Sequence, residues 1–147
     1  KDKIKIFGRL PTQNHLAEFM YHGDCGVFVS RAEGWNNEVI ETMAMNRPVI
    51  TTDYSAHTEY CNKNNSFLVD VDGIEPANDG KWFFGQGNWA KLGQKAFEQT
   101  VSHMRYVYNN HIDSNPEGVK TAKKYSWMAT TDIIDQTLTR NNSYANS

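Results

Sequence analysis

The amino-acid sequence predicts an α/β fold in which helices flank a parallel sheet of about four strands. Three observations indicate this class. Short apolar runs recur in the first half of the chain, each with the length and composition of a buried strand. Segments with apolar residues at helical spacing separate these runs. Strands that alternate with helices in this way form parallel βαβ units.

The composition of the 147 residues limits the possible classes of function. Hydrophobic residues make up 39% and charged residues 22%, and a net charge of −2 offers no basic surface for nucleic acid or anionic membranes. No apolar run approaches the ~20 residues of a membrane-spanning helix, and the first residues do not resemble a signal peptide. The two cysteines, Cys25 and Cys61, lack metal-type neighbours, so we expect buried free thiols and a cytoplasmic location.

The N-terminal part is expected to form one strand and one helix. Lys3–Phe7 predicts a strand, which Gly8 and Pro11 end. An amphipathic helix is expected over residues 12–22, because apolar residues recur there at intervals of three and four. These residues are Leu16, Phe19 and Met20.

The central stretch, residues 26–52, predicts a complete βαβ unit. The apolar run Val27–Val29 is typical of a buried strand, and residues 49–52 are typical of the next one. Asn36 and Asn37 lie where the helix between them needs an N-cap, since a short side-chain acceptor can bind a free backbone N–H. The inward face of this helix consists of Val39, Ile40, Met43 and Ala44.

Two carboxylates of this unit are expected to line one cleft at the carboxyl edge of the sheet, where parallel sheets bind ligands. Glu33 belongs to the loop after the first strand, and Glu41 lies just over one turn into the helix. The helix start between them offers free N–H groups and a partial positive charge, which suit a diphosphate. A carboxylate only accepts hydrogen bonds, so each glutamate suits a pair of sugar hydroxyls. The alternative is that both glutamates are solvated surface residues.

The chain beyond this unit predicts a short helix over His57–Cys61 and a short strand over Phe67–Val69. We interpret His57 as a surface or core histidine, although its loop could bring it to the candidate site. The glycine-rich residues 71–87 predict a long irregular loop. Its aromatic residues could stack on a sugar or base, but we favour a packing role that fixes the loop to the domain. They are Trp82, Phe83 and Phe84, with Trp89 nearby.

Three helices are expected in the last third of the chain. They cover residues 88–109, a segment that begins at Asn115 with Pro116 in its first turn, and a segment that begins near Ser126. We expect them to pack over one face of the sheet. The polar tail, residues 141–147, is expected to fray, which leaves residues 1–140 as one domain. The apolar face of the last helix comprises Trp127, Ile133, Ile134 and Leu138.

Several blocks of the sequence resemble one enzyme family. EGWNNEVIE, residues 33–41, resembles the E-x7-E signature of retaining glycosyltransferases of the GT-B type, family 4. MAMNRPVI, residues 43–50, is similar to that family's AMACGxPVI block. KIFGRL, residues 5–10, resembles its V-x-F-x-G strand, and DYSAHTE, residues 53–59, fits its next loop. The blocks follow the family's order over residues 4–70.

The resemblance implies a Rossmann-like C-terminal half of such an enzyme, which binds a nucleotide-diphosphate sugar and transfers its hexose with retention. Glu33 would be the catalytic residue that contacts the donor sugar, and Glu41 would hold the ribose. The resemblance implies no metal and no cofactor, and an unknown glycan, lipid or protein acceptor. The other donor-binding residues that it implies are Arg9 and Leu10 beside the base, and Gly34, Trp35, Asn36, Asn37, Glu38 and Val39 around the diphosphate.

The chain departs from the family at two places. The family usually has Gly-Leu-Pro at the positions of Asn36, Asn37 and Glu38, so this chain lacks a glycine and adds a negative charge there. Asn46 replaces a helix-ending glycine, which asparagine can do because it tolerates the left-handed conformation.

Two alternatives remain open at this point. Asp70-Val71-Asp72 forms a D-x-D pattern, which binds a divalent metal and a nucleotide sugar in the other large transferase architecture. The chain could also be a non-catalytic nucleotide-sugar-binding or protein-interaction module.

The resemblance also implies parts that lie outside this chain. The family's enzymes have a second, N-terminal acceptor domain, so we expect residues 1–147 alone to have little or no transfer activity. The family's sheet order, 3-2-1-4-5-6, would place two further strands between Lys3–Phe7 and the strand at residues 26–30. Lys3–Phe7 could pair with that strand, with another molecule by self-association, or with nothing.

Overall fold

The computed structural model describes residues 3–144 and confirms an α/β fold built on a parallel sheet. The sheet has the order β1-β2-β3, and Ile50 of the central strand lies opposite Val27 on one side and Phe67 on the other. All four residues of β2 are buried, as expected of a strand covered on both faces. The strands are β1 (Gly26–Phe28), β2 (Val49–Thr52) and β3 (Phe67–Val69).

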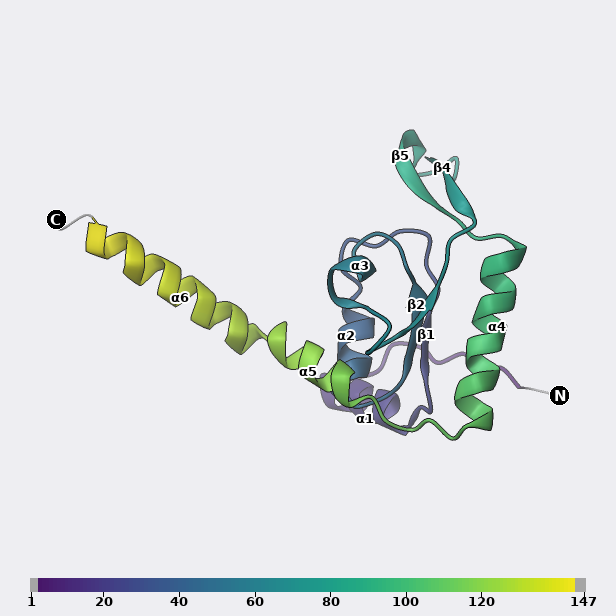
Figure 1. Ribbon diagram of the computed structural model, residues 1–147, viewed down its shortest axis with the longest axis horizontal. Coiled ribbons are helices and arrows are strands. Elements are labelled where there is room, and N and C mark those ends of the chain that lie inside the picture. Colours follow the sequence, from purple (N-terminus) through teal and green to yellow (C-terminus); the bar gives the residue numbers. More distant parts are fainter. Residues whose placement is uncertain (1–2, 145–147) are drawn as a thin grey trace.

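Helices cover both faces of this sheet (Figure 1). α2 and α5 lie on one face and α4 on the other, while α1 contacts α2. The helices are α1 (Gln13–His22), α2 (Asn37–Ala44), α3 (His57–Tyr60), α4 (Gln94–Asn109), α5 (Pro116–Lys124) and α6 (Trp127–Tyr144).

Neighbouring residues of β2 divide the core into two clusters. Val49 packs with Val39 and Met43 of α2, whereas Ile50 packs with Val69 of β3 and Ala96 of α4. This division follows from the alternation of side chains along a strand. The sheet is therefore held from both faces, and its carboxyl edge is free to carry loops.

The strand predicted over Lys3–Phe7 is wrong, and within residues 3–144 the parallel sheet has three strands rather than about four. Lys3–Phe7 is extended but pairs with none of the described residues, and its Ile4 and Ile6 side chains are 83% and 94% exposed. A strand needs a neighbour to satisfy its backbone groups, and none is available at this position. Phe7 anchors the segment by packing edge-on against Phe19 of α1, with ring centroids 5.2 Å apart.

The irregular loop predicted over residues 71–87 is also wrong, because β4 (Gly73–Asn78) and β5 (Phe84–Lys91) form an antiparallel hairpin there. The helix predicted from residue 88 consequently begins only at Gln94. Its start is fixed by Asp72, whose carboxylate accepts hydrogen bonds from the N–H groups of Gly93, Lys95 and Ala96 at 2.9–3.2 Å. This cap lies more than twenty residues upstream, so helical spacing does not reveal it.

The C-terminal helices do not pack over one face as predicted. α6 extends away from the domain (Figure 1), and Trp127 on it is 88% exposed. The tail predicted to fray begins within α6, which continues to Tyr144, and residues 145–147 lie outside the described part. None of the described helices combines the length and apolar character needed to cross a bilayer.

Candidate functional site

The loop that carries Glu33 leaves the carboxyl end of β1 and is held by Ser55. The Ser55 hydroxyl donates to the Glu33 carbonyl at 2.7 Å and accepts from the Glu33 N–H at 3.2 Å. One side chain thus satisfies both backbone groups of Glu33 and fixes its position. The Glu33 side chain is half-buried at this edge of the sheet.

His57 joins the end of β2 to the start of α2. Its Nδ1 lies 3.1 Å from the Thr52 carbonyl oxygen, which can only accept, so Nδ1 carries the proton. Nε2 is then the acceptor for the Asn36 side-chain amide, at 3.0 Å. Burial lowers the pKa of His57 and favours this neutral form, although the hydrogen bond to Thr52 and the charge of Glu33 act in the opposite direction.

Asn36 therefore does not cap α2 with its side chain as predicted. It is the N-cap residue, but its side chain makes no capping bond and binds His57 instead. Its backbone is left-handed, with φ 67°, at a position where glycine is the usual residue of the resembled family. Asn46 also adopts a left-handed conformation, with φ 58°, which confirms the prediction for the end of α2.

Tyr60 also fixes the loop that carries Glu33. Its hydroxyl lies 2.5 Å from the Trp35 carbonyl oxygen and 3.2 Å from that of Asn36. The Trp35 ring packs against Tyr60 and against Tyr125 beyond α5, with centroids 4.9 and 5.3 Å apart. Residues 33–36 are thus held by Ser55, His57 and Tyr60, three side chains from one later segment.

Glu41 lies on the side of α2 that faces α1. It lines a cavity of about 260 Å³ with Gln13, Asn14 and Ala17, and Glu33 does not line this cavity. Burial and the neighbouring charge of Glu38 raise the pKa of the Glu41 carboxyl.

Glu41→Gln is expected to raise the free energy of unfolding near pH 7 by about 0.5 kcal/mol, since solvent screens a carboxyl this exposed. The raised pKa means that the folded state binds the proton more tightly than the unfolded chain, so ionisation above the usual value of 4.5 destabilises the fold. The gain should vanish as the pH falls towards 4.5. Urea unfolding measures it, with Glu18→Gln on the exposed side of α1 as control. A loss of stability at neutral pH would contradict this account.

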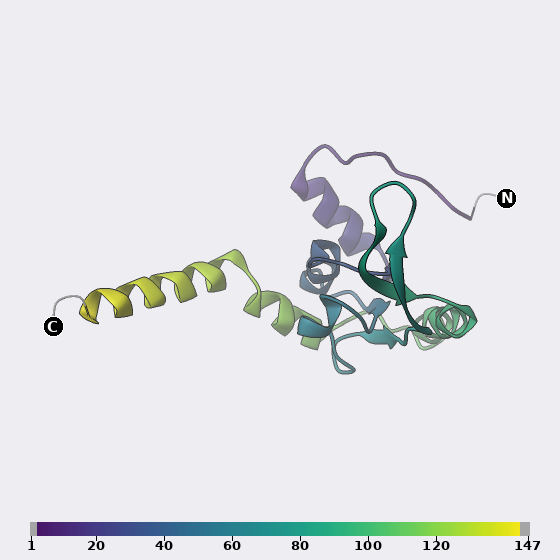
Figure 2. The same ribbon diagram turned by 90° about the horizontal axis from the view of Figure 1, so that it is seen from above.

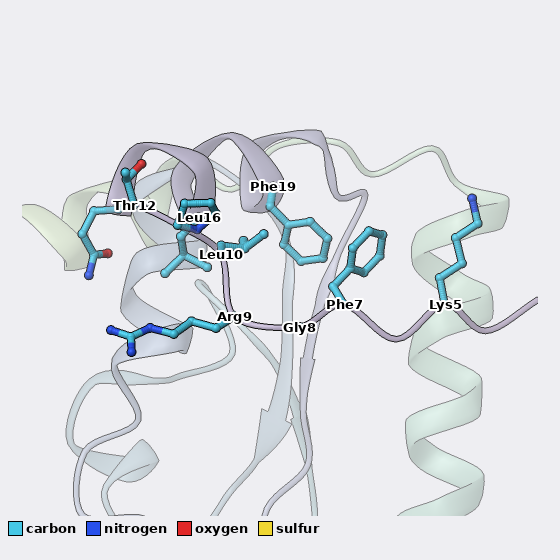
Figure 3. A pocket seen from close by; sticks show the side chains of 10 residues that line it. Lys5, Phe7, Gly8, Arg9, Leu10, Thr12, Leu16 and Phe19 are labelled. Carbon is cyan, nitrogen blue, oxygen red and sulfur yellow. The ribbon is translucent and has the colours of Figure 1, made fainter.

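The other predicted donor-binding residues lie in several places. Arg9 and Leu10 line a cavity of about 690 Å³ between the N-terminal segment and α1, which Figure 3 shows. Leu10 and Glu38 line a neighbouring cavity of about 810 Å³ that reaches the free edge of β1. Gly34 and Asn37 are exposed. Val39 is fully buried in the core, and its N–H already donates to the Asn36 carbonyl at 3.2 Å.

The D-x-D pattern has structural roles in this fold. Asp72 caps α4, and backbone hydrogen bonds from Gly93 and Ala96 lower its pKa. Asp70 pairs with Lys95, with 3.0 Å between the charged atoms. Among the described residues, no group of three or more His, Cys, Asp or Glu side chains is arranged to hold a metal ion.

Arg31 is a residue of this site that the sequence did not indicate. Its guanidinium stacks on the Trp89 ring at 3.8 Å, donates to the Ala90 carbonyl at 3.2 Å and pairs with Glu75. The Ala90 N–H in turn donates to the Arg31 carbonyl at 2.7 Å. The hairpin is thereby attached to the loop of Glu33. Only the turn dipeptide Asp79-Gly80 could have suggested that a hairpin exists here.

A comparison with known protein families agrees with this architecture. The family model described as glycosyl transferases group 1 matches residues 1–78, more than half of the chain. The match includes the βαβ unit, Ser55, His57 and Tyr60, and it ends with β4. No curated protein and no solved structure matches the chain.

Proposed function

The chain belongs to the glycosyl transferases group 1 family, and on this premise we propose that it is the donor-binding half of a retaining GT-B hexosyltransferase. Its substrate would be a nucleotide-diphosphate sugar. Turnover would require an acceptor-binding domain in addition to residues 1–147, so this part alone is expected to transfer little or no sugar.

The observation that supports this proposal best is the fixed loop at residues 33–36. Ser55 and Tyr60 bond to its backbone and His57 bonds to its Asn36 side chain, at the carboxyl edge of the sheet, where α/β folds bind ligands. A catalytic carboxylate must be positioned before the substrate arrives, because every degree of freedom lost on binding weakens the complex. We assign Glu33 to hydroxyls of the donor sugar.

We assign the other parts of the donor to successive positions along α2, from its first turn onwards. The first turn of this helix would face the diphosphate with the backbone N–H groups of Asn36, Asn37 and Glu38, since that of Val39 already donates to the Asn36 carbonyl. Glu41, about 6 Å further along the helix axis, would accept the ribose hydroxyls from the α1 side. Arg9 and Leu10 would lie beside the base. Glu38 brings a negative charge to the diphosphate end, so we expect weak binding of free nucleotide.

Titration of the chain with uridine diphosphate and guanosine diphosphate tests this proposal. We expect weak binding of one of them, reduced at least about tenfold in Glu41→Ala, because hydrogen bonds to a charged group are lost. Glu98→Ala on α4 is the matched control, since α4 covers the other face of the sheet. Unchanged affinity in Glu41→Ala would contradict the ribose role, and absence of any binding would contradict the donor site.

A further inference from the structure

The tip of the β4–β5 hairpin exposes aromatic side chains that the domain does not use for packing. Trp82 and Phe84 are 73% and 65% exposed, whereas Phe83 packs edge-on against Trp89 at 5.9 Å. The packing role predicted for these residues thus applies to Phe83 and Trp89 and is wrong for the other two. Exposed aromatic rings that gather on one feature mark a binding surface.

The tip is held in one conformation by its own backbone. One carboxylate oxygen of Asp79 accepts hydrogen bonds from the N–H groups of Lys81, Trp82 and Phe83 at 2.8–3.0 Å. These bonds lower the pKa of Asp79. Gly80 supplies the left-handed turn, with φ 71°. The rings are therefore presented on an ordered turn, which reduces the entropy lost when a ligand binds.

The base of the hairpin is fixed next to the candidate site. Arg31 attaches it to the loop of Glu33 through Trp89, Ala90 and Glu75. Figure 1 shows the hairpin beyond the carboxyl ends of β1 and β2, and Figure 2 shows that it leans towards the side of the sheet on which α1 lies. The cavities of Leu10, Glu38 and Glu41 are lined by residues of α1, so the hairpin leans towards the side of the donor-binding residues.

We propose that the hairpin tip is a carbohydrate-binding platform, on which a pyranose ring of a saccharide substrate stacks against Trp82 with Phe84 beside it. This inference rests on the proposed function. A pyranose has a face of C–H groups, which suits an aromatic ring, and a rim of hydroxyls, which needs polar partners. Both kinds of partner occur between Asn78 and Trp89, where three consecutive aromatic residues, 82–84, are flanked by polar residues on either side.

Polar partners for the hydroxyls lie next to the rings. The side-chain oxygens of Asn78 and Gln86 accept from the N–H groups of Gly80 and Phe84, so their amide nitrogens are the groups that can donate to a ligand. The Lys81 ammonium lies 5.5 Å from the centre of the Trp82 ring and adds a further donor. Asp79 and Lys81 place charges directly beside the rings, whereas the core of a protein–protein interface is depleted of charged residues, so we favour a sugar over a partner protein.

Nuclear magnetic resonance on the whole 147-residue chain tests the platform through the indole N–H signal of Trp82. The probes are maltotriose, cellotriose and chitotriose, and, separately, UDP-glucose and GDP-mannose against UDP and GDP. We expect at least one probe to shift this signal in the wild type, and the affinity, followed in both proteins through the backbone amide signals of the hairpin, to be about tenfold weaker in Trp82→Ala. Trp127→Ala, which removes an even more exposed tryptophan on α6, should change nothing. Affinity for UDP or GDP should be the same in both variants.

The sugar that binds the platform could belong to the acceptor or to the donor, and the probes distinguish the two. A response to a trisaccharide assigns the platform to the acceptor, and a response to a nucleotide sugar but not to its nucleotide assigns it to the donor. No response of Trp82 to any probe overturns the proposal, as does a change of oligomeric state in Trp82→Ala, which would identify the tip as a protein contact. Failure of UDP and GDP to bind would instead contradict the proposed function, and the trisaccharide result would still decide the platform.

Discussion

The His57→Ala variant is expected to lose about 4 kcal/mol of its free energy of unfolding. The ring is only 1% exposed and is among the largest fully buried side chains of the domain. Its removal leaves a cavity, and the Asn36 amide and the Thr52 carbonyl each lose a hydrogen-bond partner. Since a domain of this size is stable by about 5–15 kcal/mol, the variant should be close to unfolding. Urea denaturation followed by circular dichroism measures the loss.

The matched control is His22→Ala, which removes an exposed histidine at the end of α1 and should cost about 0.5 kcal/mol or less. Equal stability of the two variants would show that the buried network contributes nothing. If His57→Ala remains folded, the free Asn36 amide should also loosen the start of α2, which hydrogen exchange of its N–H groups would detect.

The same histidine gives the fold a pH dependence of known sign. Its pKa is lowered in the folded state from the usual 6.5, so below pH 6.5 the unfolded chain binds a proton that the folded chain does not. Its contribution to stability is complete above pH 6.5 and falls as the pH drops towards the lowered value. Stability measured at about pH 7.5 and about pH 5.5 should therefore differ less in His57→Gln than in the wild type.

Local signals in the sequence were sufficient to predict the central unit. β1, α2 and β2 occupy the predicted stretches because apolar runs and helical spacing are properties of neighbouring residues. The left-handed Asn46 was expected on other grounds, because it stands where the resembled family has a helix-ending glycine. His57 was interpreted as a surface or core histidine, and the structure places it in the core.

Predictions failed where the deciding partner is distant in the chain. Lys3–Phe7 has the composition of a strand, but no described neighbour pairs with it. The start of α4 depends on Asp72, and the attachment of the hairpin to the domain involves Arg31, which lies 59 residues before Ala90. No periodicity carries this information. The glycines of residues 71–87 concealed β5 because Gly85 and Gly87 adopt left-handed conformations within the strand.

In the candidate site, too, the local pattern was predicted and the long-range contacts were not. The spacing of Glu33 and Glu41 was visible in the sequence, but the contacts that fix Glu33 come from Ser55, a serine that the spacing did not single out. The two glutamates were expected to line one cleft, and Glu41 lines a cavity to which Glu33 does not contribute. Their cooperation on one donor stays a prediction, which the nucleotide titration tests.

Asn115→Ala is expected to lose about 3 kcal/mol of unfolding free energy, because one buried side chain joins three segments. Its oxygen caps α5 by accepting from the Gly118 N–H at 2.9 Å. Its amide nitrogen donates to the carbonyls of Asn65 at 2.9 Å and Arg47 at 3.3 Å. Urea unfolding measures the loss, and Asn110→Ala, which removes an exposed asparagine at the end of α4, is the control.

Asn115→Ser separates the two roles of this side chain. A serine hydroxyl can still cap α5, but it is too short to reach both carbonyls, so the variant should lose about 2 kcal/mol. The difference between the alanine and serine variants then measures the cap, and the remainder measures the link between α5 and the loops before β2 and β3. A serine variant as stable as the wild type would show that the link contributes nothing. The link affects the candidate site, because Tyr125, just after α5, packs against the ring of Trp35, which belongs to the same loop as Glu33.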